Sequence, residues 1–198
     1  MTNHGNRQKH LNPNPLQRKL LDRFHRHIIQ LVRQTGATCL LDAGCGEGFV
    51  IRALAQEKEP MHFFGGDFSA EALLWGRTHV EHEAPVANFD VQRLPFPNNS
   101  FPLVICLEVL EHLPDSRVGL RELARVSSEY VLLSVPHEPW FRGANFLRGK
   151  HLAAHGNDPE HMHNYTGRSF RHMAEPVIDL LWHGYTFPWQ IGLGRKRD

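Results

Sequence analysis

The sequence predicts an α/β fold: a Rossmann-like, doubly wound, seven-stranded sheet, mostly parallel with an antiparallel last strand, inside a three-layer αβα sandwich. Two observations predict it. Short apolar runs alternate with segments of helical periodicity over residues 38–136, and this alternation is typical of a parallel sheet with helices on both faces. A glycine-rich turn over residues 42–48 follows the first apolar run, at the end of a strand where such sheets bind ligands.

Length and composition indicate one domain. The chain has 198 residues, 41% hydrophobic and 22% charged, as in ordinary globular proteins. It contains no apolar run of about eighteen residues and no apolar signal segment, which argues against a membrane span or secretion. Cys39, Cys45 and Cys106 form no CxxC pair, so neither a disulfide framework nor a zinc site is indicated, and we expect a cytoplasmic protein.

The N-terminal part is predicted to be a flexible leader, residues 1–12, and a helix. Asn14 can cap this helix, and apolar residues recur at helical spacing as far as Gly36. We therefore expect residues 1–36 to precede a single domain at 37–198. Residues 1–34 hold seven Lys or Arg and one acidic residue, which is compatible with a solvated helix face or with a docking arm for an anionic partner.

The next elements follow the order that a doubly wound sheet requires. Strands are predicted where apolar runs end at a turn or an acidic residue, and helices where apolar residues recur every three or four positions. The predicted strands are 38–43, 61–65, 85–89, 103–107 and 130–135, and the predicted helical segments between them are 47–56, 69–81, 108–113 and 116–127.

Residues 137–166 break this alternation. They are rich in His, Pro, Gly, Asn and aromatic residues and are too long for an ordinary connection, which indicates a lid or a substrate-binding insertion. A helix over 167–174 and strands over 177–182 and 189–193 complete the chain. A turn near Gly184 would make these last strands an antiparallel pair.

The glycine turn excludes two common nucleotide-binding motifs. A P-loop needs a lysine after its last glycine, and a nicotinamide fingerprint needs G-x-G-x-x-G spacing; this turn has neither. Asp67 and Asp90 end the next two predicted strands. At the carboxyl edge of a doubly wound sheet, the first can accept hydrogen bonds from ribose hydroxyls and the second from an adenine amino group, and Phe68 can pack on a purine.

Taken together, these segments resemble the class I S-adenosylmethionine-dependent methyltransferases, especially the ubiquinone/menaquinone biosynthesis-type branch, methyltransferase type 11-like. The similar segments are 41–48, 66–69, 90–101 and 107–113, and the resemblance covers roughly residues 38–136. Pro102 departs from the family, which usually has Asp after Phe101. That carboxylate is usually structural, so the departure affects a local turn more than the cofactor site.

The resemblance implies that S-adenosyl-L-methionine binds and is converted to S-adenosyl-L-homocysteine by in-line methyl transfer to an oxygen, nitrogen or carbon of a small molecule. It places the methionine part of the cofactor at the turn, the ribose at Asp67, the adenine at Asp90 and the opposite side at Leu107. The implied cofactor-binding residues are Asp42, Gly44, Cys45, Gly46, Asp67, Phe68, Asp90, Val91 and Leu107.

Histidines are the candidates on the acceptor side. A base is required only when the acceptor must lose a proton, and imidazole titrates in a suitable range. The likeness of the insertion to a lid in some bacterial members of the branch points to His161, then His137 and Tyr165, with His112 as a further candidate. Acidic and histidine residues at 158–163 can bind a metal, but solvated histidines are the commoner outcome, so no metal is predicted.

Other interpretations stay open. Aromatic residues form either an apolar acceptor pocket or ordinary core: Trp140, Phe141, Phe146, Tyr165 and Trp189. One alternative function is that of an RNA- or protein-modifying methyltransferase that docks through its basic N-terminal residues. Another is that of a non-catalytic S-adenosylmethionine-binding partner subunit. The chain has no Asn-Pro-Pro-Tyr-like motif and no room for a separate RNA-binding domain, which argues against a nucleic-acid partner.

Overall fold

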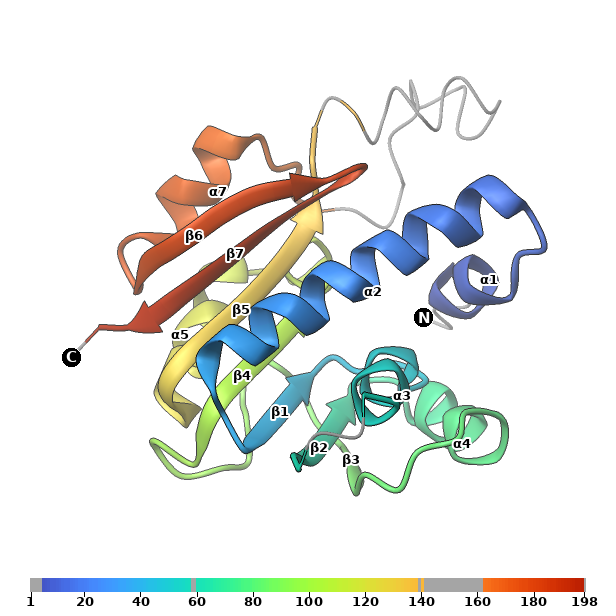
Figure 1. Cartoon of the computed structure of the whole chain (residues 1–198). Coiled ribbons are helices and arrows are strands. Elements are labelled where there is room, and N and C mark those ends of the chain that lie inside the picture. Colours follow the sequence, from blue (N-terminus) through green and yellow to red (C-terminus); the bar gives the residue numbers. More distant parts are fainter. Residues whose placement is uncertain (1–4, 58–59, 139, 141–161, 198) are drawn as a thin grey trace.

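The computed structural model describes residues 5–57, 60–138, 140 and 162–197. Within these residues one sheet has the strand order β3-β2-β1-β4-β5-β7-β6 (Figure 1). Strands β1 to β5 pair in parallel, and β7 is antiparallel to both of its neighbours. The strands are β1 (Cys39–Ala43), β2 (His62–Asp67), β3 (Val86–Asn88), β4 (Phe101–Leu107), β5 (Ser127–Pro136), β6 (Ile178–Thr186) and β7 (Trp189–Lys196). The predicted fold class is confirmed.

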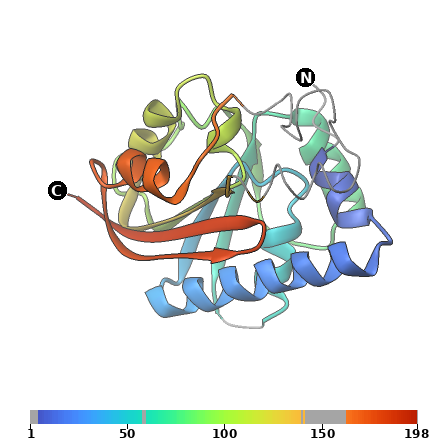
Figure 2. The same cartoon turned by 90° about the horizontal axis from the view of Figure 1, so that it is seen from above.

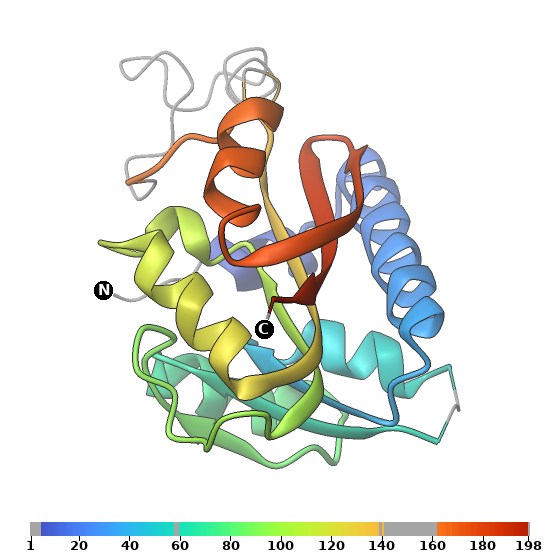
Figure 3. The same cartoon turned by 90° about the vertical axis from the view of Figure 1, so that its left-hand side faces the viewer.

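Helices cover both faces of this sheet. Figures 2 and 3 show α2 on one side of the strands, with α5 and α7 on the other. The helices are α1 (Gly5–Leu11), α2 (Pro15–Thr35), α3 (Phe49–Ala55), α4 (Ala70–His79), the 3-10 turn η1 (Leu110–His112), α5 (Ser116–Val126) and α7 (Gly167–Ala174). Among the described residues, no helix is both long and apolar enough to cross a membrane.

Strand β4 shows why both faces are covered. Its side chains alternate between the faces, so Leu103 and Ile105 pack in one cluster with α2, while Val104 and Cys106 pack in another with α5 and α7. All four side chains are fully buried. Full burial of an aliphatic side chain contributes about 2 kcal/mol, so this central strand is held from both sides.

The signals at the ends of α2 act as the sequence predicts. The Asn14 side chain accepts hydrogen bonds from the backbone N–H groups of Leu16 and Gln17 at 2.9 and 3.3 Å. At the other end Gly36 adopts a left-handed φ of 65°, a conformation that favours glycine at a helix terminus.

At the start of β4, Pro102 lies where the register between β4 and β5 shifts, because proline has no N–H group for the ladder.

Three predicted boundaries are wrong. Residues 5–11 of the expected flexible leader form α1, which is held by contacts with residues distant in the sequence. The helix expected at 108–113 shortens to η1, because Glu108 has a φ of 60°, incompatible with a right-handed helix. Gly184 lies inside β6 opposite Ile191, and the last two strands are joined at Phe187-Pro188.

The strand order determines at which point of the sheet's edge a ligand is expected to bind. From β1 the chain moves outward through β2 to β3 and then returns to the other side of β1 as β4. Such a reversal opens a crevice at the carboxyl ends of the two central strands. The glycine turn follows β1 directly, so it lies at this point.

Candidate cofactor and active site

The glycine turn is fixed in a conformation that requires glycine. Gly44, Gly46 and Gly48 have φ angles of 94°, 54° and 85°, a region that other residues rarely adopt. A Cβ on Gly44 would lie 2.3 Å from Val109 Cγ2. The backbone N–H groups of Gly44 and Cys45 donate to the Gly66 carbonyl at 2.7 and 3.0 Å, which ties the turn to β2.

Asp67 connects this turn to the start of α4. One carboxylate oxygen accepts from the Gly46 N–H and the other from the Ser69 N–H, both at 2.8 Å. Burial raises the pKa of Asp67, and these two hydrogen bonds oppose the rise. Because a carboxylate oxygen accepts more than one hydrogen bond, Asp67 can bind a hydroxyl-bearing ligand while it holds the turn.

Asp42 is a buried acid beneath the turn. It is 2% exposed, and burial, followed by the negative charge of Asp67, raises its pKa to about 8. The free protein therefore holds this carboxyl largely protonated at neutral pH. A cation such as an ammonium group would restore its charge, because opposite charge favours the ionised form.

The other predicted cofactor residues occupy the same edge in different environments. Val91 and Cys45 are buried, and burial raises the Cys45 thiol pKa well above its usual value. Asp90 accepts a hydrogen bond from the Gln92 N–H at 2.8 Å. Leu107 ends β4 and is 8% exposed, whereas Phe68 is 77% exposed and leaves a ring face open to a planar ligand.

Helix α1 covers the turn, which sequence reasoning missed. Asn6 Nδ2 donates to Glu47 Oε2 at 2.5 Å, and a Cβ on Gly46 would lie 2.9 Å from the same nitrogen. The His10 ring stacks on Phe49 with centroids 4.1 Å apart. Figure 1 shows α1 beside the ends of α3 and α4. The segment is short, polar and without apolar periodicity, so its sequence carried little signal for a helix.

Two acceptor-side candidates come together. His137 and Tyr165 form a β-bridge, and the Glu138 N–H donates to the Tyr165 carbonyl at 2.9 Å. The His137 ring packs against Trp140 and Tyr185 with centroids 4.5 and 4.7 Å away. Burial lowers the pKa of His137 and raises that of Tyr165. Burial thus makes His137 a weaker base than a free imidazole, and it keeps the Tyr165 hydroxyl protonated.

Of the two remaining candidates, one can be placed. His112 belongs to η1, whose Glu111 carbonyl accepts from the N–H groups of Met162 and His163 at 2.8 and 3.1 Å. His161 lies outside the described residues, as does most of the predicted lid. Within the described part of the chain, no three His, Cys, Asp or Glu side chains gather to hold a metal ion.

Of the two interpretations left open for the aromatic residues, the structure favours core packing for Tyr165 and Trp189. Tyr165 packs in the cluster on the α5 and α7 face, while Trp189 packs on the opposite face against Phe24 of α2 at a ring distance of 4.8 Å. Both are core residues on different sides of the sheet. Trp140 is instead partly exposed beside Tyr185 and Phe187, and Phe141 and Phe146 lie outside the described residues.

Glu108 lies at the same edge, and the sequence analysis did not single it out. It directly follows β4, and its Oε1 accepts from Ser134 Oγ at 3.0 Å. Its Oε2 is buried and makes no geometrically defined hydrogen bond to a described residue. Burial raises the pKa of Glu108 to about 7, opposed by the charge of Lys9 and by the Ser134 and Trp189 side chains. The available signal was its position, because Asp67 and Asp90 also stand at or just after a strand end.

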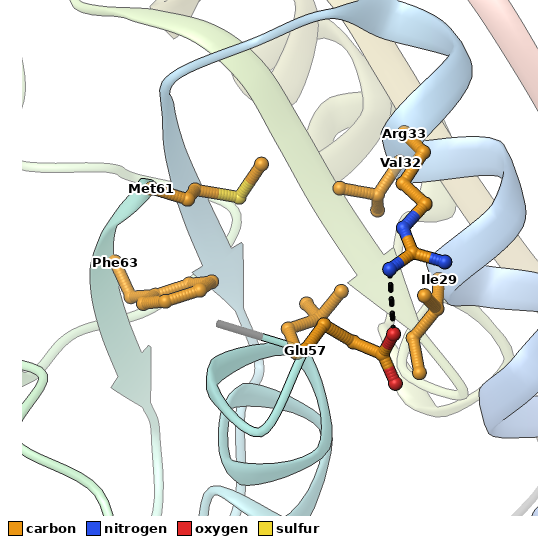
Figure 4. A pocket seen from close by; sticks show the side chains of 7 residues that line it. Ile29, Val32, Arg33, Glu57, Met61 and Phe63 are labelled. Carbon is orange, nitrogen blue, oxygen red and sulfur yellow. Dashed lines mark hydrogen bonds and ion pairs between the residues drawn. The ribbon is translucent and has the colours of Figure 1, made fainter. Parts of the chain in front are cut away.

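A hollow elsewhere on the molecule is separate from this edge. Ile29, Val32 and Met61 help to line it, and Arg33 pairs with Glu57 at 2.6 Å across it (Figure 4). Met61 precedes β2, so the hollow lies at the opposite end of the strand from Asp67. Arg33 is thus paired with Glu57, although its side chain is 44% exposed, and the Arg7 guanidinium lies 5.3 Å from the Trp75 ring centroid.

Known proteins resemble part of this chain in sequence. Residues 41–131 match the family described as methyltransferase domain. A demethylmenaquinone methyltransferase of Listeria welshimeri is 34% identical over 113 residues, which cover 54% of this chain and 48% of the relative. A fatty-acid O-methyltransferase of Mycolicibacterium smegmatis is 32% identical over 112 residues, which cover 53% of this chain and 41% of the relative. The chain thus matches about half of each relative's length.

A solved structure extends the likeness of the fold to most of the chain. Magnesium protoporphyrin IX methyltransferase from Synechocystis PCC 6803, with bound S-adenosylhomocysteine, has a TM-score of 0.73 over 96% of this chain and 92% of its own, at 16% identity. The resemblance predicted from the sequence is confirmed: residues 41–131 match the methyltransferase domain, and the relatives named above are methyltransferases.

Proposed function

We propose that this protein transfers the methyl group of S-adenosylmethionine to a small-molecule acceptor. The observation that carries the proposal is the hydrogen bond from the Gly46 N–H to Asp67. This bond joins the glycine turn to the end of β2 at the topological switch point, inside the segment that matches the methyltransferase family. The geometry supports a ligand whose hydroxyls face Asp67 and whose cationic end lies near Asp42.

The chain's own residues have three tasks in such a reaction. The turn and Asp67 hold the methionine and ribose parts of the cofactor, and Asp42 faces the ammonium group. Leu107 and α1 limit the access of water. Because the sulfonium donor is already activated, alignment and exclusion of water supply most of the rate enhancement: the S–CH3 bond breaks as the acceptor–CH3 bond forms in line.

The acceptor is proposed to be a sizeable, partly apolar small molecule. The three similar proteins are named for demethylmenaquinone, fatty acid and magnesium protoporphyrin IX. In this chain the partly exposed rings of Trp140, Tyr185 and Phe187 stand beside His137 at the carboxyl edge of the sheet. Aromatic side chains at a site rim provide apolar contact area for such a molecule.

The test is transfer of label from S-adenosylmethionine carrying a tritiated methyl group to an extract of small metabolites. The wild-type chain should label at least one small organic product, and Asp67→Asn should lower the transfer at least tenfold. Asp22→Asn, an exposed change on α2, should leave it unchanged. Label that enters only RNA or protein would instead support the macromolecule-modifying alternative. No transfer despite tight cofactor binding would support the non-catalytic alternative.

A further inference from the structure

The segment that follows β4 packs against the glycine turn. Val109 packs against Gly44 so closely that a Cβ there would clash, and Glu108 is the residue before it. The φ of 60° at Glu108 is unusual for a residue other than glycine. Such conformations cost about 1–3 kcal/mol and cluster at functional sites. The backbone is therefore held in an unfavourable conformation at the position that follows Leu107.

The two oxygens of the Glu108 carboxyl have different surroundings. Ser134 of β5 donates to Oε1, while Oε2 is buried and makes no geometrically defined hydrogen bond to a described residue. The indole of Trp189 of β7 lies near enough to act as a donor that lowers the Glu108 pKa, and Lys9 of α1, the helix that covers the turn, is the cation that acts on the carboxyl. Glu108 thus lies between α1, which covers the turn, and strands β5 and β7.

We propose that Glu108 accepts the proton that the methyl acceptor loses, and that the acceptor atom is therefore a hydroxyl oxygen, an amine nitrogen or an acidic carbon, not a carboxylate oxygen. This inference rests on the proposed function. In the balanced step, the S–CH3 bond breaks and its electron pair stays on sulfur. The acceptor–CH3 bond forms, and the acceptor's proton moves to Oε2 of Glu108. A carboxylate acceptor is already ionised at neutral pH and would need no such group.

Two alternatives for this role, His137 and Tyr165, are less well placed. His137 packs between Trp140 and Tyr185 beyond the end of β5. The Tyr165 side chain is in the core cluster on the α5 and α7 face. Glu108 directly precedes Val109, which contacts the turn, and burial brings its pKa to about 7, where a general base is most effective near neutral pH.

The experiment measures label transfer from tritiated S-adenosylmethionine to the metabolite extract between pH 5.5 and 9. For the wild type the rate should rise through about pH 7 as the base ionises, and the products should keep their label in mild alkali. Glu108→Gln should lower the rate at least 100-fold, the lower range for loss of a general base, with cofactor affinity within about threefold. The exposed Glu175→Gln is the matched control and should change neither quantity.

A second variant keeps the proposal testable if Glu108→Gln folds poorly. Ser134→Ala removes a hydrogen bond that lowers the Glu108 pKa, so the rising limb should move to higher pH while the rate at pH 9 is retained. Three results would each overturn the inference. Glu108→Gln could transfer label within about threefold of the wild-type rate, the rising limb of the pH–rate profile could stay in place in Ser134→Ala, or the products could be alkali-labile methyl esters. Those results leave the proposed function standing, whereas absence of transfer by the wild type overturns both.

Discussion

At the scale of single residues, the candidate site contains backbone conformations that are unfavourable for most residues and carboxyl groups that are buried. Gly44 has a left-handed φ, and a Cβ there would clash with Val109. The Asp42 carboxyl is buried. Glu108 has both a buried carboxyl and a left-handed φ. Departures from local preference are concentrated at functional sites. These three residues lie at the carboxyl ends of β1 and β4, where the strand order reverses.

Gly44→Ala should destabilise the protein and abolish cofactor binding. The new methyl group would lie 2.3 Å from Val109 at a φ of 94°, so strain and overpacking act together and should lower the free energy of unfolding by about 2–4 kcal/mol. Gly36→Ala is the control, because Gly36 has a φ of 65° with nothing within 4 Å of its added Cβ, and should cost about 1 kcal/mol. Urea denaturation measures both; equal losses would contradict the steric account of the turn.

Asp42→Asn should change how stability depends on pH. The folded-state pKa of Asp42 is raised from 3.8 to about 8, so its favourable contribution is present below pH 4 and is lost as pH rises through about 8. Each unit of pKa difference corresponds to about 1.4 kcal/mol. In the cofactor-free protein, the stability of Asp42→Asn relative to wild type should therefore increase between pH 5 and pH 8.5. Thermal denaturation across this range measures it, and a constant difference would rule out the raised pKa.

At the scale of elements, local signals account for most of the helices and strands but not for those held by distant contacts. Helix α2 carries its cap, its apolar stripe and its terminal glycine in its own sequence, so it could be predicted. Helix α1 owes its place to Glu47 and Phe49, which are about forty residues away and act only after folding. Likewise β6 passes through Gly184 because β7 pairs with it beyond that glycine.

Asn6→Ala should speed the release of S-adenosylmethionine. The change removes the hydrogen bond from Asn6 to Glu47 and loosens α1 over the turn. Loss of one such bond is worth about 0.5–1.5 kcal/mol, so the dissociation rate should rise about 2- to 12-fold. Asn12→Ala, between α1 and α2, is the matched control, because Asn12 bonds to Gln17 and not to the turn. Stopped-flow displacement measures both rates, and an unchanged rate in Asn6→Ala would mean that α1 does not retain the cofactor.

At the scale of the whole molecule, the fold class followed from alternation alone, because a parallel sheet buried on both faces leaves few arrangements for such elements. The shared position of the predicted cofactor residues also followed, since Asp67 and Asp90 lie at or just after strand ends that the topology brings to one edge; their roles toward the cofactor stay predictions. The acceptor side did not. Tyr165 and Trp189 were indistinguishable as pocket or core until the sheet assigned them to opposite faces. Glu108 could not be separated from a helical glutamate without its backbone conformation.

Titration calorimetry with S-adenosylmethionine tests the central claim most directly. The wild-type chain should bind the cofactor saturably at one site. Asp67→Asn should weaken binding at least tenfold, because an amide replaces the carboxylate that accepts from Gly46, Ser69 and the proposed ribose hydroxyls. Asp22→Asn should bind as the wild type does. No saturable heat for the wild type, or equal affinity in Asp67→Asn, would contradict the assignment of this edge as the cofactor site.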